Sequence, residues 1–330
     1  MEATIQGAIL AFDIGGTRIK AGIVDGNNQI LARDSIWTEG HRGIEDVVQR
    51  ASQFGRSMMT DIQLSSVDGV GVACTGVIDT ETGTVIQLNG KIPDIEGAAL
   101  GPMFAEAFSC PSRVDNDGRT FCIGEWQGGA AKGAHDVVGM TIGTGIGSGV
   151  ILNGKALRTR GHLGGILGGH LTIDPNGEWC SCGNRGCLET VGSVTALLSK
   201  VKDYVRRGHR TTLAEYVLSP EASLTGEAVL NAYRNGDEVA RYAVDRWLQW
   251  LGAGAVTLIH TYDPEVLVVG GGIMQAGPEV VDAMAEYVAR HAWTTPPGRV
   301  KVVSAQLRDD AALIGAAHLV RSYTELEEAE

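Results

Sequence analysis

The hydrophobic and polar positions of this chain follow two periods. Short apolar runs that lead into glycine turns, such as "GAILAFDIGG" and "VDGVGVACTG", are typical of buried β-strands. Longer stretches repeat their apolar residues every three to four positions, as expected for α-helices that bury one face. The two patterns predict strands and helices that follow one another over most of the chain.

Three strands of an antiparallel meander are predicted over residues 7–37, and a helix follows over residues 43–62. After residue 62, strand patterns and helix patterns alternate along the chain. Further strands are predicted within residues 67–76, 112–117, 136–154, 264–273 and 300–307, and further helices over 100–109, 118–132, 188–206, 236–260, 278–292 and 309–325. This alternation indicates an α/β protein with helices packed on sheets.

One strand–turn–strand pattern occurs twice. Residues 12–26, "FDIGGTRIKAGIVDG", align with residues 140–154, "MTIGTGIGSGVILNG", at an offset of 128 positions. Hairpins with glycine turns can resemble one another by chance, so two interpretations stay open. If a domain is duplicated, two glycine turns face each other across a cleft, where their backbone N–H groups can hold a polyphosphate. Neither turn has the GxxxxGK[ST] pattern, nor a GxGxxG that opens a helix, so those nucleotide folds are disfavoured.

Composition narrows the choice of partners. The 330 residues predict about two domains, and the formal net charge of −12 argues against nucleic acid or an anionic membrane as a partner. No apolar run reaches the roughly 18 residues of a membrane span, and the N-terminus lacks the pattern of a secretory signal. We therefore expect a cytoplasmic protein.

Half of the six cysteines fall in one short loop, "NGEWCSCGNRGCLE". The other three, Cys74, Cys110 and Cys122, lie far apart in the sequence. In a reducing compartment, clustered cysteines bind a metal or carry redox chemistry more often than they form disulfides. The loop is therefore a candidate metal or redox site.

Several motifs together resemble the ROK family of sugar kinases and sugar-responsive repressors. The strings "DIGGT", "TGVIDTETG", "NDG", "TIGTGIGSGVILNG", "CSCGNRGCLE" and "DPEVLVVGGGI" occur in the family's order, over about residues 8–320. The cysteine string is highly specific, whereas the glycine loops alone are weak signals. The repressor branch carries an N-terminal helix-turn-helix domain, for which the residues before Gly15 leave no room. The resemblance therefore favours a kinase of the glucokinase or N-acetylhexosamine kinase type.

The resemblance implies an actin-like, hexokinase-like fold with two ribonuclease H-like α/β domains and a cleft between them. The smaller domain is expected over residues 1–118 together with a C-terminal helix at about 307–330. The larger domain, residues 119–306, is expected to hold the cysteine loop and most of the ATP site. A sugar would bind in the cleft, and the resemblance also suggests a homodimer.

The cysteine loop then predicts a zinc site. His170, Cys180, Cys182 and Cys187 form the pattern H-x9-C-x-C-x4-C, and one imidazole with three thiolates is a common closed tetrahedral zinc set. Four protein ligands leave no open position, so such a zinc would be structural. The alternative is a cluster of free or redox-active thiols.

The stretch "RVDNDGRT" contains the candidate catalytic group. Taken alone, it reads as a turn followed by a helix N-cap. The resemblance implies instead that Asp117 is the general base of phosphoryl transfer and that Asn116 hydrogen-bonds the sugar. Arg119 departs from the small residues that usually follow this pair in the family.

The resemblance also assigns the remaining ligand contacts. Asp13 would hold Mg²⁺ or its water molecules, and ATP would lie on Gly15, Gly16, Thr17, Gly143, Thr144, Gly145, Gly147, Gly270, Gly271 and Gly272. Sugar contacts would include Asn89, His170 and Glu189. Each glycine cluster can also be a plain tight turn, Asn89 an ordinary turn residue, and Glu189 a charge in the first turn of a helix.

Two functions follow from these residues. The favoured one is ATP-dependent phosphorylation of a hexose or hexose derivative, with the 6-OH as the expected acceptor; the alternative is a non-catalytic sugar-binding or regulatory protein. One position bears on the sugar. Glucose-using members carry a glutamate three residues before the zinc histidine, where this chain has Leu167, preceded by Ile166 in place of glycine.

Three interpretations of Leu167 stay open. The pocket accepts a sugar other than plain glucose, or His162 or Glu189 serves the same hydroxyls, or the protein no longer works as a kinase. The sequence favours the first, because leucine accepts no hydrogen bond and an apolar wall suits an N-acyl group, a deoxy position or a different epimer.

Overall fold

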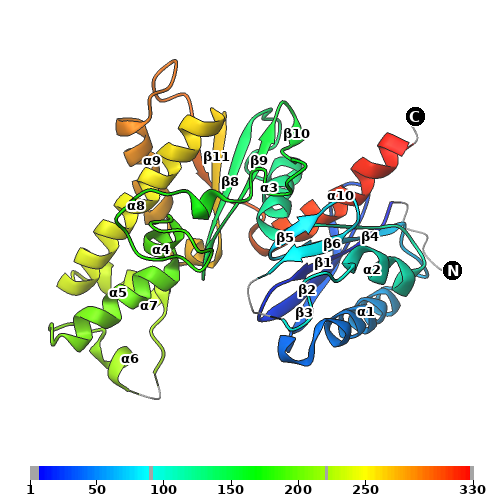
Figure 1. The fold of residues 1–330 in the computed structure, drawn as a ribbon, viewed down its shortest axis with the longest axis horizontal. Coiled ribbons are helices and arrows are strands. Elements are labelled where there is room, and N and C mark those ends of the chain that lie inside the picture. The colour runs from blue at the N-terminus through cyan, green and yellow to red at the C-terminus, as the bar shows by residue number, and fades with distance from the viewer. Residues whose placement is uncertain (1–6, 89–91, 220–221, 328–330) are drawn as a thin grey trace. The chain divides into compact units, whose positions relative to one another are not determined.

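The structure is a computed structural model that describes residues 7–88, 92–219 and 222–327, with side chains up to Ser322 (Figure 1). The chain divides into two compact units, which are described separately. Unit 1 comprises the chain up to Ala134, Gly149–Ile166 and the segment from Gln306, and unit 2 comprises His135–Ser148 and Leu167–Ala305. The domain boundary expected at residue 118 stays a prediction. Among the described helices, none is long and apolar enough to cross a membrane.

Unit 1 is built on a five-stranded sheet with the order β3-β2-β1-β4-β7. Strands β1 (Ile9–Ile14), β2 (Arg18–Val24) and β3 (Ile30–Trp37) are antiparallel neighbours, which confirms the predicted meander. Strands β4 (Gly69–Cys74) and β7 (Ser112–Asn116) run parallel to β1. The carboxyl ends of β1, β4 and β7 therefore meet at one edge of the sheet.

Helices cover both faces of this sheet. Leu10, Phe12 and Ile14 of β1 belong to a core that they share with residues of α1 and α2, while Ile9 and Ala11 pack with residues of α10. Successive strand residues point to opposite faces, so burial on both sides explains why β1 is a continuous apolar run. The helices of unit 1 are α1 (Ile44–Asp61), α2 (Leu100–Phe108), α3 (Asp117–Gly128) and α10 (Ala311–Glu327), and a small hairpin consists of β5 (Val77–Asp79) and β6 (Thr84–Gln87).

The second sheet has the order β10-β9-β8-β11-β12. It consists of β8 (Val137–Ile142), β9 (Ile146–Leu152), β10 (Lys155–Ala156), β11 (Val266–Gly270) and β12 (Lys301–Ser304). Its strands pair as those of the first sheet do, since β9 and β10 are antiparallel neighbours and β8, β11 and β12 are parallel. Two sheets with one order and one set of directions support the duplication that the repeated hairpin suggested.

Helices of unit 2 pack against one another around α8 and α9 (Figure 1). The single helix predicted over residues 188–206 is split, because the Ser193 hydroxyl accepts a hydrogen bond from the Ala196 N–H and so caps a new helix. The helices of unit 2 are α4 (Glu189–Gly192), α5 (Val194–Arg206), α6 (Ala214–Leu218), α7 (Gly226–Arg234), α8 (Glu238–Tyr262) and α9 (Glu279–His291), with the short 3₁₀ helices η2 (Gly168–His170) and η3 (Gly272–Ala276). Two further 3₁₀ helices, η1 (Gly40–Arg42) and η4 (Arg308–Asp310), belong to unit 1.

Helices α3 and α10 of unit 1 touch through their backbones. A methyl group on Gly124 of α3 would overlap the carbonyl oxygen of Ala311, and one on Gly315 of α10 would overlap the carbonyl oxygen of Thr120. Glycine at these two positions lets the helices approach closely. Because α3 begins at Asp117, this contact also fixes the helix that carries the candidate base.

This contact generates a prediction for stability. Gly124→Ala should lower the free energy of unfolding by about 1–3 kcal/mol or more, because the methyl group overpacks a backbone contact that cannot yield locally. Gly128→Ala is the matched control in the same helix, since its methyl group would meet only Leu307 Cδ1 at 3.8 Å and Ile314 Cγ2 at 4.0 Å. Chemical denaturation measures both variants. Equal stability of the two would show that α3 and α10 separate without cost.

Candidate active site and metal cluster

The Asp117 carboxylate lies at the edge of the first sheet where β1, β4 and β7 end. One oxygen, Oδ2, accepts a hydrogen bond from the Thr75 hydroxyl at 3.0 Å. The other, Oδ1, accepts from the Gly118 N–H at 2.9 Å and from Asn116 Nδ2 at 3.1 Å. Three donors fix the plane of this half-buried carboxylate, and the remaining lone pair, on Oδ2, can still accept a proton.

The Asn116 amide holds the turn between β7 and α3. Its oxygen accepts the Arg119 N–H at 3.1 Å, so the sequence-based expectation of a helix N-cap is confirmed. Its nitrogen donates to the Gly76 carbonyl at 2.9 Å and to the Asp117 carboxylate. Both amide hydrogens thus serve the protein itself, and only an oxygen lone pair is left for a sugar.

A second carboxylate, Asp13, is the last residue but one of β1 in the same unit. Lys20 lies opposite it on β2, with its Nζ 3.9 Å from Asp13 Oδ2 and 2.8 Å from Asp309 Oδ1. Burial raises the pKa of Asp13 to about 6, against a smaller lowering by Lys20, and the Asp117 and Asp309 carboxylates add to the rise. Two carboxylates at one sheet edge are oxygen ligands of the kind that Mg²⁺ prefers.

The first glycine turn joins β1 to β2, and residues outside the turn hydrogen-bond to its backbone. The Gly15 N–H donates to the Arg18 carbonyl at 3.1 Å, which closes the turn. The fully buried Thr38 donates its hydroxyl to the Gly15 carbonyl at 2.7 Å and its N–H to the Thr17 carbonyl at 2.9 Å. The backbone of Gly15, Gly16 and Thr17 is therefore fixed before any ligand binds.

Unit 2 contains a pocket of about 480 Å³ at its own glycine turn. Of the predicted nucleotide residues, Gly143, Thr144 and Gly272 line it, and both of these glycines have open space where a side chain would be. Open glycines let a ligand approach the backbone. No sequence motif pointed to the rest of the lining, which consists of Val194, Thr195, Leu198, Gly226, Glu227, Ile273, Gln275 and Ala276.

Other predicted nucleotide glycines have a packing role in the structure. A side chain on Gly145 would overlap the Glu189 carboxylate, whose Oε2 accepts the Ile146 N–H at 2.8 Å. Gly271 has φ +105°, and a side chain there would overlap the Ile142 carbonyl. Gly145, Gly147, Gly270 and Gly271 do not line the pocket. Glu189 is the first residue of α4, as its helix-terminus interpretation expected.

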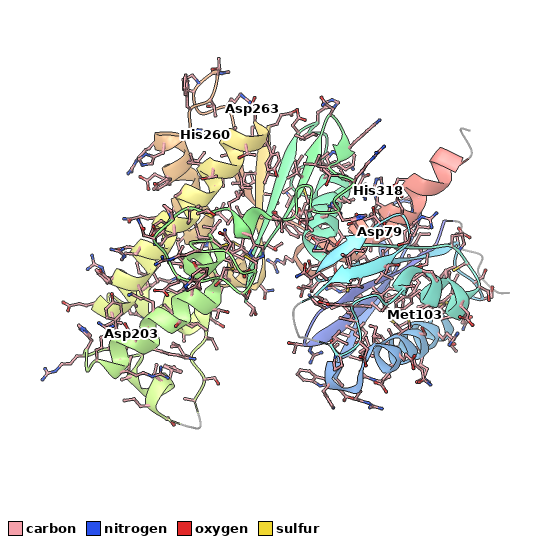
Figure 2. The ribbon with its side chains drawn as sticks, viewed as in Figure 1. Asp79, Met103, Asp203, His260, Asp263 and His318 are labelled. Carbon is pink, nitrogen blue, oxygen red and sulfur yellow. The ribbon has the colours of Figure 1, made fainter. Side chains whose placement is uncertain are left out.

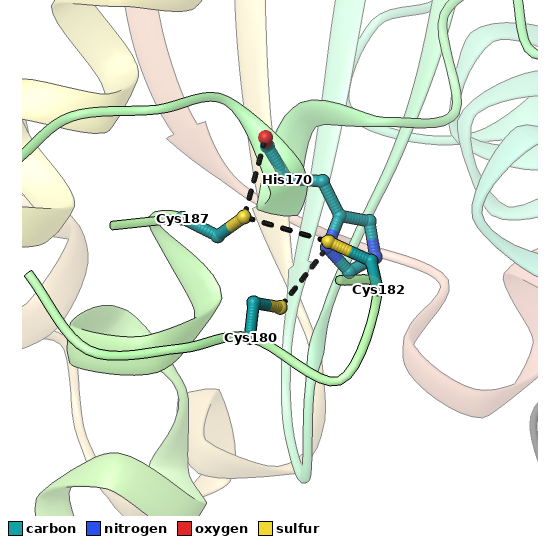
Figure 3. A group of neighbouring side chains, drawn as sticks. All are labelled: His170, Cys180, Cys182 and Cys187. Carbon is teal, nitrogen blue, oxygen red and sulfur yellow. Dashed lines mark hydrogen bonds between the residues drawn. The ribbon is translucent and has the colours of Figure 1, made fainter. Parts of the chain in front are cut away.

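His170, Cys180, Cys182 and Cys187 come together in unit 2 as one cluster (Figure 3). Their ligand atoms all lie within 4.8 Å of one another, with Cys180 Sγ 3.5 Å from His170 Nδ1 and Cys182 Sγ 3.7 Å from Cys187 Sγ. Tetrahedral zinc with bonds of about 2.3 Å to sulfur separates its ligand sulfurs by about 3.8 Å. The four residues therefore fit a single zinc ion.

The remaining predicted residues differ in what the structure says of them. Asn89 lies outside the described residues. Leu167 precedes η2 and is 38% exposed, so its apolar side chain is open to a ligand or to solvent. Ile166 is buried, and His162 lies in unit 1, where its Nδ1 is 3.8 Å from Asp79 Oδ1.

Two features next to Asp117 were not predicted from the sequence. Thr75, the partner of Asp117, stands in the quoted string "TGVIDTETG", and a hydroxyl directly after a buried strand was the available signal. Arg119 was noted only as bulky, yet it forms a buried ion pair with Asp115. The only signal for this ion pair in the sequence is that Asp115 and Arg119 are four residues apart, near the start of a predicted helix.

Comparison with known proteins gives both kinases and repressors. Residues 9–323 match the ROK family. A glucokinase of Thermotoga maritima is 31% identical over 316 residues, which cover 95% of this chain and 97% of that protein. A xylose repressor of Caldicellulosiruptor bescii is 27% identical over 282 residues, which cover 84% of this chain and 66% of the repressor.

A solved structure of a ROK family protein has a similar fold. A ROK family glucokinase from Streptomyces griseus, in complex with glucose and AMPPNP, has a TM-score of 0.81 and 30% identity, covering 96% of this chain and 99% of that chain. The fold is thus the expected mixed α/β, two-domain fold of the hexokinase-like, actin-like class. Since the family match spans nearly all of its residues, the chain belongs to the ROK family.

Proposed function

We propose that this protein is an ATP-dependent sugar kinase that phosphorylates a hydroxyl of a hexose or hexose derivative, with the 6-OH as the acceptor. The observation that carries the proposal is the Asp117 carboxylate, oriented by Thr75, Asn116 and the Gly118 N–H at the end of a sheet. The names of the relatives support it, since the Thermotoga protein is a glucokinase and the Streptomyces griseus structure holds glucose and AMPPNP.

Asp117 acts as the general base in this proposal. Its carboxylate takes the proton of the sugar hydroxyl as the oxygen attacks the γ-phosphorus, and the bond from phosphorus to the bridging oxygen breaks to release ADP. Thr75 and Asn116 hold the carboxylate so that it does not rotate away from the hydroxyl. Asn116 therefore contributes mainly through Asp117, and its spare lone pair can accept from a sugar hydroxyl.

Each unit contains its own candidate contacts for the nucleotide. The pocket that Gly143, Thr144 and Gly272 line has a volume suited to a small ligand and would take the adenosine. In the first glycine turn, the N–H groups of Gly16 and Thr17 would face the phosphates, and Gly15 would lie beside them with its own N–H on the Arg18 carbonyl. Asp13 would hold Mg²⁺ or its water molecules, and the ion neutralises charge on the phosphates when bound.

The four-residue cluster is assigned to structural zinc. His170 and three cysteines supply four ligands, so the ion has no open position and fixes the loop rather than taking part in the chemistry. The loop places Glu189 two residues after Cys187, and Glu189 in turn holds the Ile146 N–H. Zinc would thus stabilise the turn next to the nucleotide pocket.

The second candidate is a regulatory protein that binds a sugar without phosphorylating it. The similarity to a xylose repressor favours it. The presence of both Asp13 and Asp117 argues against a regulatory function, because sugar binding alone does not need two oriented carboxylates at one sheet edge. An assay of ADP release with hexoses, hexosamines and N-acylated hexosamines separates the two functions. Sugar binding without any ADP release would favour the regulatory function. The homodimer and the cytoplasmic location stay predictions.

Asp117→Asn tests the general base. The variant should keep sugar binding but lower kcat by about 10²–10⁴-fold, because an amide cannot take the hydroxyl proton. The measurement is steady-state kinetics together with calorimetric titration of the sugar. Asp94→Asn makes the same chemical change at an exposed residue of unit 1 and should leave kcat unchanged. Near-normal turnover of Asp117→Asn would place the base elsewhere.

Cys182→Ser tests the zinc assignment. The native protein should purify with about one zinc per chain, and the variant should lose the metal and unfold at a lower temperature, because three ligands hold structural zinc poorly. Metal analysis and thermal denaturation are the measurements, with Cys110→Ser as a control outside the cluster. A metal-free native protein of full stability and activity would contradict the assignment.

Leu167→Glu tests the sugar preference. A hydroxyl placed against Leu167 loses a hydrogen bond worth about 1–3 kcal/mol, or roughly ten- to hundred-fold in affinity. The native protein should therefore prefer a sugar other than glucose, and the variant should shift toward glucose. The measurement is kcat/KM for glucose, mannose and their N-acetylated 2-amino counterparts, with the exposed Leu218→Glu as control. High native glucose activity that Leu167→Glu only lowers would exclude an altered pocket.

A further inference from the structure

Unit 1 buries a charged pair directly behind the candidate base. Asp115 and Arg119 are 0% and 1% exposed, and the Arg119 Nη1 donates to Asp115 Oδ1. The same Asp115 oxygen accepts the Asn116 N–H at 2.7 Å. A buried charge is costly unless it is paired and hydrogen-bonded, so a chain that retains such a pair uses its geometry.

The other end of the Arg119 guanidinium holds a loop. Its Nη2 donates to the Gly164 carbonyl at 2.8 Å and to the His162 carbonyl at 3.4 Å. The second Asp115 oxygen accepts from the half-exposed Arg158 at 2.8 Å and 3.2 Å, which holds the same loop at its start. The network therefore ties residues 158–164 to the strand end that carries Asn116 and Asp117.

The hydrogen bonds of Arg119 to this loop hold His162 in a restricted backbone conformation. The residue has φ +62°, a left-handed conformation that costs free energy in a residue other than glycine and that often accompanies function. Its side chain is 30% exposed, and its Nδ1 lies 3.8 Å from Asp79 Oδ1. The imidazole thus has one nitrogen near a carboxylate and keeps part of its surface open to solvent.

Strand β5 connects the surroundings of His162 to those of the candidate base. Asp79, labelled in Figure 2, ends β5, and Gly76, just before β5, accepts the hydrogen bond from Asn116. Three residues of extended chain span about 10 Å. One monosaccharide and the side chains that hold it fit such a span.

We propose that His162 is a further sugar-binding residue and that Arg119 is the positioning residue that places it. The imidazole, with Nδ1 toward Asp79, offers its Nε2 to a sugar hydroxyl, while Asp115 and Arg119 keep the loop at a fixed position relative to Asn116 and Asp117. This inference rests on the proposed sugar kinase activity and adds a specificity-determining contact to it.

Two substitutions of His162 separate the side chain from the backbone. His162→Gly keeps the left-handed conformation and removes the imidazole, and His162→Asn keeps both the conformation and a polar group. His162→Gly should raise the sugar KM by about tenfold, with kcat and the KM for ATP little changed, because one hydrogen bond to the sugar is lost. His162→Asn should recover part of the loss.

A double-mutant cycle tests the positioning by Arg119. Arg119→Met should also raise the sugar KM, and His162→Gly should add less than about twofold in that background, because the imidazole is already misplaced. Arg119→Lys, which keeps the charge but not the forked donors, serves if Arg119→Met does not fold. Arg56→Met is the control, since Arg56 also donates to a backbone carbonyl in unit 1, at Ala107.

The kinetics use glucose, mannose and N-acetylglucosamine as probes, with calorimetric titration of each sugar alongside. An unchanged sugar KM in His162→Gly, or additive effects in the cycle, overturns the inference while leaving the kinase proposal intact. A purely structural Arg119 would lower the unfolding temperature without raising the sugar KM of the folded enzyme. A native protein that neither binds nor phosphorylates any sugar tested would overturn both proposals.

Discussion

The side-chain amide of Asn116 is the interaction on which unit 1 and its candidate site both depend. Its oxygen starts α3, and its nitrogen joins β7 to the segment before β5 and orients the Asp117 carboxylate. An amide is suited to this position because it is a donor and an acceptor at once and carries no charge that burial would penalise. Fold and chemistry therefore use the same group, so neither can change there without the other.

The fold was largely predictable because periodicity reports burial directly. The meander of β1, β2 and β3 and the long helices α1, α8 and α9 all have strong patterns over their whole length. The split at Ser193 was not predicted, because a serine inside an apolar helical pattern becomes a cap only when the backbone turns there. The repeated hairpin gained its meaning only when two sheets with one strand order were seen.

The candidate site was predictable in its residue types and less so in their contacts. The members of the Cys/His cluster were found by their spacing, since a metal site imposes both its donor atoms and their number. The glycine clusters looked alike in sequence but differ in the structure: Gly143 and Gly272 face open space, whereas Gly145 and Gly271 make room for Glu189 and for a carbonyl. Such differences depend on neighbours far away in the chain, as do the hydrogen bonds from Arg119 to the His162 and Gly164 carbonyls.

The C-terminal helix has a consequence for how the protein is made. Unit 1 begins with the first strands, yet one face of its sheet is covered by α10, whose backbone at Ala316 lies where a side chain on Gly71 would be. Apart from its first strand and turn, unit 2 is one continuous segment that leaves the ribosome earlier than α10. The unit that contains the first strands is thus the last to complete its core. Ile9, Ala11 and Val24 stay without their packing partners Leu313 and Val320 until α10 has been synthesised.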